Sequence, residues 1–464
     1  MPEFAPSDVA ATADGANDHS TTEEGGRSAR GHIGLIVLTS IAVGLGLGLV
    51  LDLLVFGGSR ETVITGFALL SLAFGYALLA ELSALRTDQP QRWARVPAIA
   101  FGVTGLAILI LNPSNHVLGL LGWIWSILLA VLVVWMFRES RRSLHSWSRR
   151  ALLYPSFALL ALVALGGAYE TVMEAATSNE PPAGGRTYLV AGHSLYLRCV
   201  GSGSPAVILF NGLAERTPSW AWVQRDVARQ TRVCVFDRAG QGWSGKGAGR
   251  QDAHQLSADV RGLLAAANVP GPYVLAGHSV GGTYALAYAM DYPKDVAGVA
   301  LIDSATPYQF DLPDYPGFYK LWRRAQALLP TLARAGVARA YSLGTYSSLP
   351  SDAGRAARAF SSSPRELRAD RDEFAALPTV FRQDKALTSL GRKPLFVLTA
   401  DRGQQSGWPA AQNKLAGLST NSVHQTTHGA THAALLDDRD YAAVSSRAID
   451  ALVRSVRTGG PLAR

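Results

Sequence analysis

Apolar and polar positions follow two different patterns along this chain of 464 residues, and the change lies near residue 180. Before it, apolar residues form long runs, and a helix needs about 20 such residues to cross a bilayer. Five segments approach or exceed that length: 32–56, 63–85, 96–112, 116–137 and 152–173. They predict an all-α transmembrane bundle of about five helices over residues 31–175, in which the third segment is the shortest.

Beyond residue 186 the apolar runs become short and rich in β-forming residues. Eight runs predict strands: TYLVAG, SLYLRCV, AVILF, RVCVF, YVLAG, GVALI, PLFVL and the weaker SVHQTT. Helical patterns alternate with them at 219–229, 254–268, 280–291 and 441–456. This alternation predicts a mainly parallel sheet covered on both faces, within an α/β domain at 186–456. The polar segment 1–30 is expected to be a disordered tail, and 457–464 a short terminal tail.

Basic residues are distributed unevenly among the loops that flank the long apolar runs. Ten arginines lie on one side of the predicted bundle: Arg27, Arg30, Arg86, Arg92, Arg95, Arg138, Arg141, Arg142, Arg149 and Arg150. The two short loops of the opposite side contain only Arg60. Since cytoplasmic loops carry the excess of Lys and Arg, we expect a multi-pass protein of the cell membrane with a cytoplasmic N-terminus and an extracytoplasmic α/β domain. Much of the net charge of +8 lies in these loops, and no basic stripe or aromatic RNA motif predicts nucleic-acid binding.

A short stretch, YVLAGHSVGG, carries a candidate nucleophile where a strand passes into a helix. Ser279 stands at the apex, and glycines two residues to either side, Gly277 and Gly281, avoid a collision of side chains in so sharp a turn. The helix that begins at Val280 offers unpaired N–H groups beside the hydroxyl. A glycine-rich turn without a nucleophile can also have this spacing by chance. The residues at the neighbouring strand ends are needed to distinguish the two interpretations.

Two further strand ends complete a pattern. The tripeptide NGL (211–213) follows AVILF, and DRAGQGWS (237–244) follows RVCVF. With the serine turn, they make residues 187–456 resemble the α/β-hydrolase family, which has a D-x-x-G-x-G-x-S loop ahead of its nucleophile. The resemblance implies an eight-stranded, mostly parallel sheet and a helical cap at 305–390. Aromatic residues near the start of the cap would shape an apolar pocket or pack the cap onto the sheet.

The resemblance also implies a catalytic triad in the chain order serine, acid, histidine. Ser279 would be the nucleophile and His432, after the eighth strand, its base, while His428 is interpreted as structural. Two aspartates are candidates for the acid: Asp303 ends the sixth strand, and Asp401 follows the seventh. Asp303 is preferred, because Asp401 lies short of the position that the family uses most often.

An oxyanion hole and a disulfide are further implications of the resemblance. The backbone N–H groups of Val280 and Leu213 would bind the oxyanion. The second and fourth strands are antiparallel neighbours in this family, so Cys199 and Cys234 are expected to form a disulfide rather than remain buried thiols. The extracytoplasmic location favours the same outcome.

These features predict a membrane-tethered serine hydrolase that cleaves a carboxylic ester, apolar or lipid-like, through an acyl-enzyme. A peptidase or amidase on the same fold is one alternative, and a non-catalytic binding or sensing domain on a multi-span membrane protein is another. The sequence has no metal-ligand cluster or dinucleotide motif, so no cofactor is expected. The expected partners are a small-molecule ester and the lipid bilayer.

Overall fold

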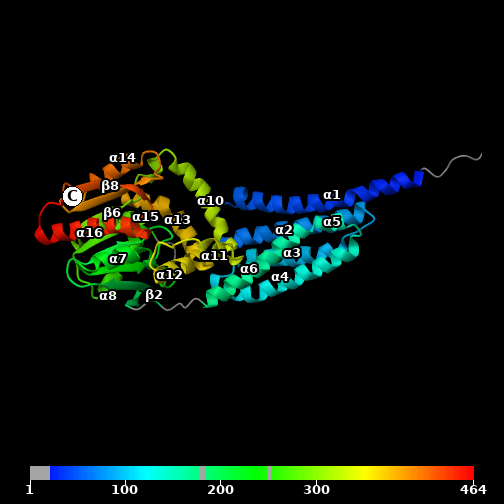
Figure 1. Cartoon of the computed structure of the whole chain (residues 1–464), viewed down its shortest axis with the longest axis horizontal. Coiled ribbons are helices and arrows are strands. Elements are labelled where there is room, and N and C mark those ends of the chain that lie inside the picture. The colour runs from blue at the N-terminus through cyan, green and yellow to red at the C-terminus, as the bar shows by residue number, and fades with distance from the viewer. Residues whose placement is uncertain (1–20, 177–180, 182–183, 248–251, 464) are drawn as a thin grey trace, which may run out of the picture.

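The computed structural model describes residues 21–176, 181, 184–247 and 252–463. The chain is elongated, with a bundle of helices at one end and an α/β body at the other (Figure 1). Residues 1–20, most of the predicted disordered tail, lie outside the described residues, and α1 already begins at Thr21 within that segment. The last helix, α16, ends at Thr458.

The N-terminal part of the chain consists of helices. Their bounds are α1 (Thr21–Val50) with the π-helical turn η1 (Leu51–Val55), α2 (Glu61–Arg86), η2 (Arg92–Ala94), α3 (Arg95–Leu111), α4 (Asn115–Ser143), α5 (Trp147–Ala151) and α6 (Tyr154–Ala176). Five stretches are long and apolar enough to cross a membrane: Ile33–Val55, Glu61–Arg86, Arg92–Leu111, Asn115–Ser143 and Trp147–Ala176. The shortest predicted segment is therefore among them.

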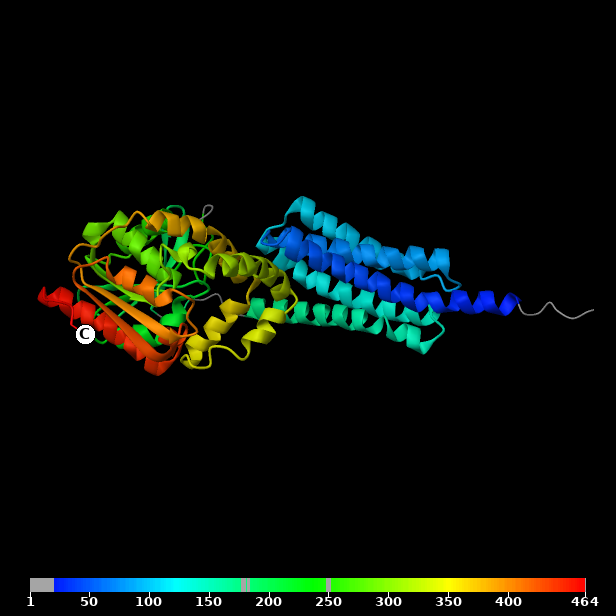
Figure 2. The same cartoon turned by 90° about the horizontal axis from the view of Figure 1, so that it is seen from above.

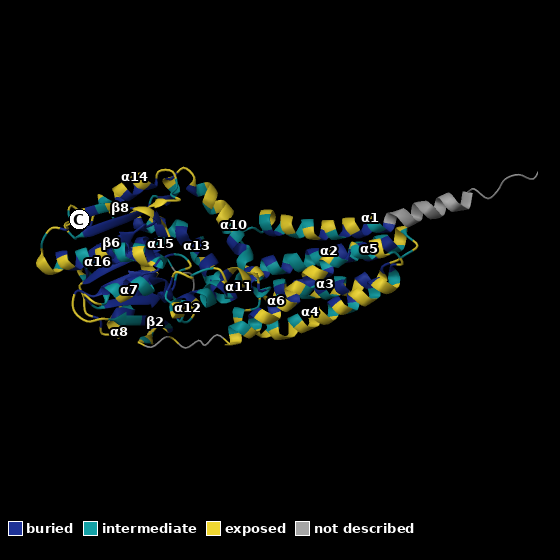
Figure 3. Ribbon diagram, viewed as in Figure 1, coloured by how far each residue is buried: buried dark blue, intermediate teal, exposed yellow. Residues whose placement is uncertain are grey.

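Many positions on the outside of the bundle are exposed (Figure 3), and they include large apolar residues, whereas glycines lie between its helices. A Cβ atom on Gly44 of α1 would lie 3.0 Å from the Cα atom of Gly75 on α2, so these backbones approach closely. Ile99, Ile110 and Leu162 are exposed on the outer faces of α3 and α6. Large exposed apolar side chains on every side of a bundle are expected where lipid surrounds it.

One sheet of eight strands forms the centre of the α/β body, in the order β1-β2-β4-β3-β5-β6-β7-β8. The strands are β1 (Gly185–Val190), β2 (His193–Val200), β3 (Val207–Phe210), β4 (Val233–Asp237), β5 (Tyr273–His278), β6 (Val296–Ile302), β7 (Leu395–Arg402) and β8 (Ser422–Thr431). β2 pairs antiparallel with β1 and β4, and all other neighbours are parallel. The sheet and the apolar helical bundle confirm the fold that was predicted from the sequence.

The central strands contribute to an apolar core on each face of the sheet, since successive side chains point to opposite faces. Ile208 and Phe210 of β3 join one apolar core, and Val207 and Leu209 join the other. Helices α8 (Ala253–Ala266) and α9 (Val280–Asp291) cover the first face, while α7 (Ala221–Val227) and α16 (Arg439–Thr458) cover the second. The minor elements are η3 (Thr217–Trp220), η4 (Pro293–Asp295), α14 (Trp408–Ala416) and α15 (Ala434–Asp437).

A helical insertion between β6 and β7 lies between the sheet and the bundle (Figures 1 and 2). It contains η5 (Gln309–Asp311), α10 (Tyr315–Arg334), α11 (Val337–Ser342), α12 (Ser351–Ser362) and α13 (Pro364–Asp384). We call these elements the cap, and they fall within the segment 305–390 that the sequence assigns to one. The cap therefore contacts both the α/β body and the apolar helices.

Buried ion pairs join the cap to the bundle. Glu61, at the start of α2, has no exposed surface and pairs with Arg334 of α10 and Arg368 of α13. Arg339 of α11 donates to Glu170 of α6 across 2.8 Å. Because an unpaired buried charge is costly, these contacts fix the cap on the bundle as long as both partners are present.

The predicted disulfide is present. Cys199 and Cys234 are direct partners in the antiparallel pairing of β2 and β4, and they are bonded to each other. The bond therefore joins neighbouring strands through two cysteines that lie 35 positions apart in sequence.

Candidate active site

Ser279 stands on a sharp turn between β5 and α9. Its backbone has φ 54° and ψ −129°, in a region that side-chain-bearing residues rarely occupy. A Cβ atom on Gly277 would collide with the carbonyl of Gly281, and one on Gly281 would collide with the carbonyl oxygen of Phe210. Glycine is therefore required at both positions for the backbones to pass each other.

Two further predicted residues, Asp303 and His432, meet beside this turn. The Ser279 N–H donates to the carbonyl of Ile302 across 3.2 Å, so Asp303, the next residue, lies beside the serine. His432, in the loop after β8, places Nδ1 2.6 Å from Oδ2 of Asp303. The Asp303 side chain is fully buried, whereas that of His432 is 46% exposed and open to an entering molecule.

Asp303 is held by several donors besides His432. Its Oδ1 accepts from Trp408 Nε1 at 2.9 Å and from the N–H of Ala400 at 3.2 Å, and its Oδ2 accepts from Gln404 Nε2 at 3.1 Å. Burial alone would raise the pKa of this carboxyl, but the hydrogen bonds and the charge of His432 hold it below the usual value. An ionised Asp303 suits the role of orienting an imidazole.

The alternative acid, Asp401, lies elsewhere. Its Oδ2 is 3.0 Å from Nδ1 of His428, and its Oδ1 accepts from the N–H of Gly429 at 2.8 Å. His428 is 90% exposed, so this pair lies on the surface of the last strands. The structure thus brings Asp303, and not Asp401, to His432, and it places His428 in the other pair.

The proposed oxyanion donors border the same turn. Val280 is the first residue of α9, where no intrahelical carbonyl is available to its N–H. Leu213 follows β3, and the carbonyls of Asn211 and Gly212 just before it accept from Arg238 at 2.5 and 2.8 Å. The family commonly has histidine at position 211; here the side-chain amide of Asn211 donates to the Phe236 carbonyl at 2.7 Å and fixes the turn.

A pair that the sequence did not predict, between the buried His278 and the partly buried Glu215, braces both sides of the site. His278 Nδ1 bonds to Glu215, whose other oxygen accepts from the N–H of Gly212 at 2.6 Å. His278 Nε2 lies 3.0 Å from the backbone carbonyl of His432, and the two rings are 4.4 Å apart. The pair thus connects the turn before Leu213 with the loop that carries His432. The only signal in the sequence was a histidine directly before the candidate nucleophile.

Each member of this pair stabilises the charged form of the other. Burial would lower the pKa of His278, but the adjacent Glu215 carboxylate raises it above the ordinary value. Burial would likewise raise the pKa of Glu215, yet His278 and the hydrogen bonds lower it. We therefore describe the pair as an imidazolium and a carboxylate.

The cap is fixed over the site by buried ion pairs. Arg216 pairs with Glu366 at 2.7 Å and with Asp370 at 2.5 Å, both on α13. Arg238, which holds the turn before Leu213, pairs with Glu373 of the same helix at 2.9 Å. One cap helix is therefore bonded directly to the loops that border the serine.

The aromatic residues of the cap serve mainly for packing. Tyr315, Phe374 and Phe381 are buried in the core on one face of the sheet, while Phe318 and Trp322 of α10 are partly exposed. A separate cavity of about 1320 Å³ lies between the cap, α7 and the end of α6. Neither Ser279 nor His432 lines it, so it is distinct from the candidate reaction site.

Comparisons with known proteins agree with this architecture. A family model described as "alpha/beta hydrolase fold" matches residues 205–438, just over half of the chain. The Cif epoxide hydrolase from Acinetobacter nosocomialis has a similar structure, with a TM-score of 0.51 and 15% identity, over 62% of this chain and 96% of that one.

Two proteins with sequences similar to this chain are described as uncharacterized. YqjL of Bacillus subtilis is 24% identical over 259 residues, which are 54% of this chain and 90% of that protein. A protein of Schizosaccharomyces pombe is 26% identical over 237 residues, 49% of this chain. That alignment spans only 43% of the yeast protein's length.

Proposed function

Because the chain belongs to the alpha/beta hydrolase fold family, we propose that it is a serine hydrolase, tethered to a membrane by its helical bundle, that cleaves a carboxylic ester. The observation that carries the proposal is the hydrogen bond between His432 and Asp303 beside Ser279. A serine hydroxyl is a weak nucleophile at neutral pH, and an imidazole oriented by a carboxylate activates it.

In this mechanism, Asp303 accepts a hydrogen bond from Nδ1–H of His432, which leaves Nε2 to accept the Ser279 proton. The serine oxygen attacks the ester carbonyl carbon, and the resulting oxyanion accepts hydrogen bonds from the N–H groups of Val280 and Leu213. His432 returns the proton to the leaving alkoxide as the C–O bond breaks. Water then attacks the acyl carbon and gives a proton to His432, which donates it to the Ser279 oxygen as the acyl C–O bond breaks and the acid is released.

An apolar or lipid-like ester is the substrate class that we propose. Phe318 and Trp322 of α10 are 44% and 41% exposed. The next residues of the same helix, Arg323 and Arg324, lie against Gly58 and Gly57 at the end of the apolar bundle. The exposed aromatic side chains of the cap thus lie near the end of the bundle, where it would leave the bilayer. This position favours substrates that partition into the membrane surface.

The test is labelling of the full-length protein with a fluorophosphonate probe, followed by hydrolysis of p-nitrophenyl esters of increasing chain length. We expect Ser279→Ala to abolish labelling and to lower kcat about 10⁴- to 10⁶-fold, while Ser347→Ala, in an exposed cap loop, matches the unaltered protein. Amides with the same acyl groups separate an esterase from an amidase. Folded protein that neither reacts with the probe nor hydrolyses any ester would instead support a binding or sensing domain.

A further inference from the structure

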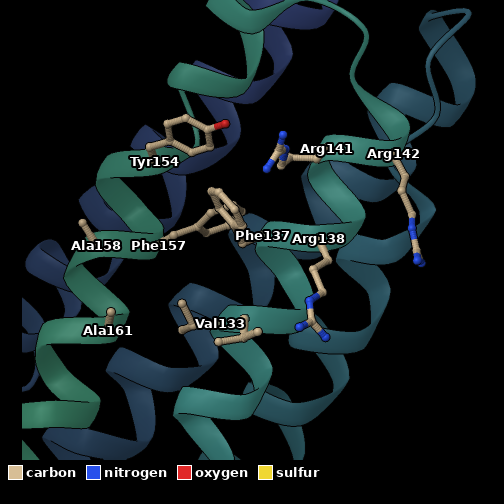
Figure 4. Close-up of a pocket in the computed structure, with 10 residues that line it drawn as sticks. Val133, Phe137, Arg138, Arg141, Arg142, Tyr154, Phe157, Ala158 and Ala161 are labelled. Atoms are coloured by element: carbon tan, nitrogen blue, oxygen red, sulfur yellow. The ribbon is translucent and has the colours of Figure 1, made fainter.

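A groove between α4 and α6 lies at the end of the bundle away from the α/β body (Figures 1 and 4). Its volume is about 610 Å³. Apolar side chains form its floor: Val133, Val134, Phe137, Phe157, Ala158 and Ala161. Tyr154, Arg141 and Arg142 lie toward its outer end, while the side chain of Arg138 points down toward Val133 (Figure 4). The groove therefore has an apolar part within the bundle and a cationic part near the bundle's end.

Two of the three arginines are available to a ligand. Arg142 pairs with Glu139 at 2.6 Å, and Figure 4 shows its side chain directed away from the groove. Arg141 extends toward Tyr154, with its guanidinium 5.7 Å from the centre of the Phe137 ring. Within the described ranges, neither Arg138 nor Arg141 is paired with a carboxylate. The groove thus presents two positive charges beside an apolar surface.

We propose that this groove binds one anionic phospholipid, with its headgroup at the arginines that line the groove and the first part of an acyl chain along the apolar floor. A basic pocket between apolar helices at the bundle end is suited to an anionic headgroup. Each guanidinium can donate two parallel hydrogen bonds to phosphate oxygens. A free phosphate ion would leave the apolar floor unused, so the shape and the charge together select an amphiphile.

The groove also distinguishes between headgroups. The nearest carboxylate on α4, Glu139, is already paired with Arg142. A choline cation placed beside the arginines of the groove would therefore have no acidic side chain of α4 as a partner. An uncharged glycerol headgroup on the same phosphate avoids this repulsion. The proposal rests on insertion of the bundle into a membrane and is independent of the hydrolase chemistry.

Native mass spectrometry of the full-length protein in detergent tests the site, with phosphatidylglycerol and phosphatidylcholine of identical acyl chains as probes. We expect one phosphatidylglycerol to be retained, at least 10-fold more tightly than phosphatidylcholine. Arg138→Gln with Arg141→Gln should weaken phosphatidylglycerol binding at least 10-fold. The matched control is Arg86→Gln with Arg92→Gln, which removes the same charge from exposed positions at the end of α2 and the start of η2, at the same end of the bundle.

A second variant changes the shape of the groove without changing its charge. Ala161→Phe places a ring in the floor of the groove and leaves both arginines in place, and it should also weaken phosphatidylglycerol binding. Equal affinity for the two lipids, unchanged binding in the double arginine variant or in Ala161→Phe, or an equal loss in the control pair would each overturn the proposal.

Discussion

At the scale of single residues, the backbone is strained where the proposed chemistry is concentrated. Ser279 has φ 54° and Asp303 has φ 40°, and both bear side chains. Such conformations cost about 1 to 3 kcal/mol each, and they persist only where the surroundings hold them. Here the surroundings are the buried strand ends of β5 and β6 and the four donors to the Asp303 carboxylate. The sheet thus supports a geometry that a free chain would abandon.

The two candidate acids are expected to respond very differently to removal of their charge. Asp303→Asn keeps the shape of the side chain but no longer orients the His432 imidazole, so kcat should fall about 10⁴-fold. Asp401→Asn affects only the surface pair with His428 and should change kcat less than about twofold. Steady-state hydrolysis of the best ester, with thermal melting to verify folding, measures both. A larger loss in Asp401→Asn would reverse the assignment.

At the scale of elements, the site depends on contacts between segments that are distant in sequence. Glu215 lies in the turn after β3, His278 ends β5, and the carbonyl of His432 belongs to the loop after β8. These contacts join residues 63 and 154 positions apart. The pair therefore ties together three loops at the carboxyl edge of the sheet, where sites of such folds collect.

Breaking this pair should destabilise the protein in a pH-dependent way. His278 has a raised pKa, so its contribution to stability is complete below the ordinary value of 6.5 and is lost as pH rises through the pKa of the folded state. Glu215 has a lowered pKa, so its contribution is present above 4.5 and is lost only in stronger acid. We expect Glu215→Gln to cost about 3 to 5 kcal/mol between these limits, with a smaller difference at alkaline pH.

Thermal melting between pH 5 and pH 10 measures this effect. Asp352→Asn is the matched control, because it removes a carboxylate from an exposed pair with Arg355 and should cost under about 1 kcal/mol. A difference between Glu215→Gln and the unaltered protein that does not vary with pH would argue against a charged pair.

The strands and helices were largely predictable, because their signals are local. Each of the eight predicted runs became a strand, and the four helical patterns correspond to α7, α8, α9 and α16. The pairing of His278 with Glu215 and of Glu61 with Arg334 was not predictable, since the partners lie 63 and 273 residues apart and no local pattern records which buried charges meet. The choice between Asp303 and Asp401 likewise needed the position of His432 in space.

At the scale of the whole molecule, the arrangement of the chain follows its charge pattern. The loop between α2 and α3 and the segment around α5 lie at the end of the bundle away from the sheet (Figure 1). Arg60, by contrast, precedes α2 at the end that contacts the cap. The arginine-rich loops and the α/β body are therefore at opposite ends, an arrangement compatible with the orientation that the charge pattern predicts.

This orientation is testable with single introduced cysteines. Asp88→Cys lies in the loop between α2 and α3, and Lys294→Cys lies in η4 of the α/β body; both positions are exposed. A membrane-impermeant maleimide should label Lys294→Cys on intact cells and Asp88→Cys only after permeabilisation. The native cysteines are bonded to each other, so the parent protein is the blank. The opposite labelling pattern would place the α/β body in the cytoplasm.

The buried pairs between cap and bundle have a consequence for any attempt to obtain the catalytic body alone. Cutting away the apolar helices would remove Glu61 and Glu170, and Arg334, Arg368 and Arg339 would lose their counter-charges together. A water-soluble or secreted version would need other residues at these three positions to keep the same arrangement of the cap. The cap and the bundle are therefore expected to change together in sequence, because a change at either side of these pairs leaves a buried charge on the other side without its partner.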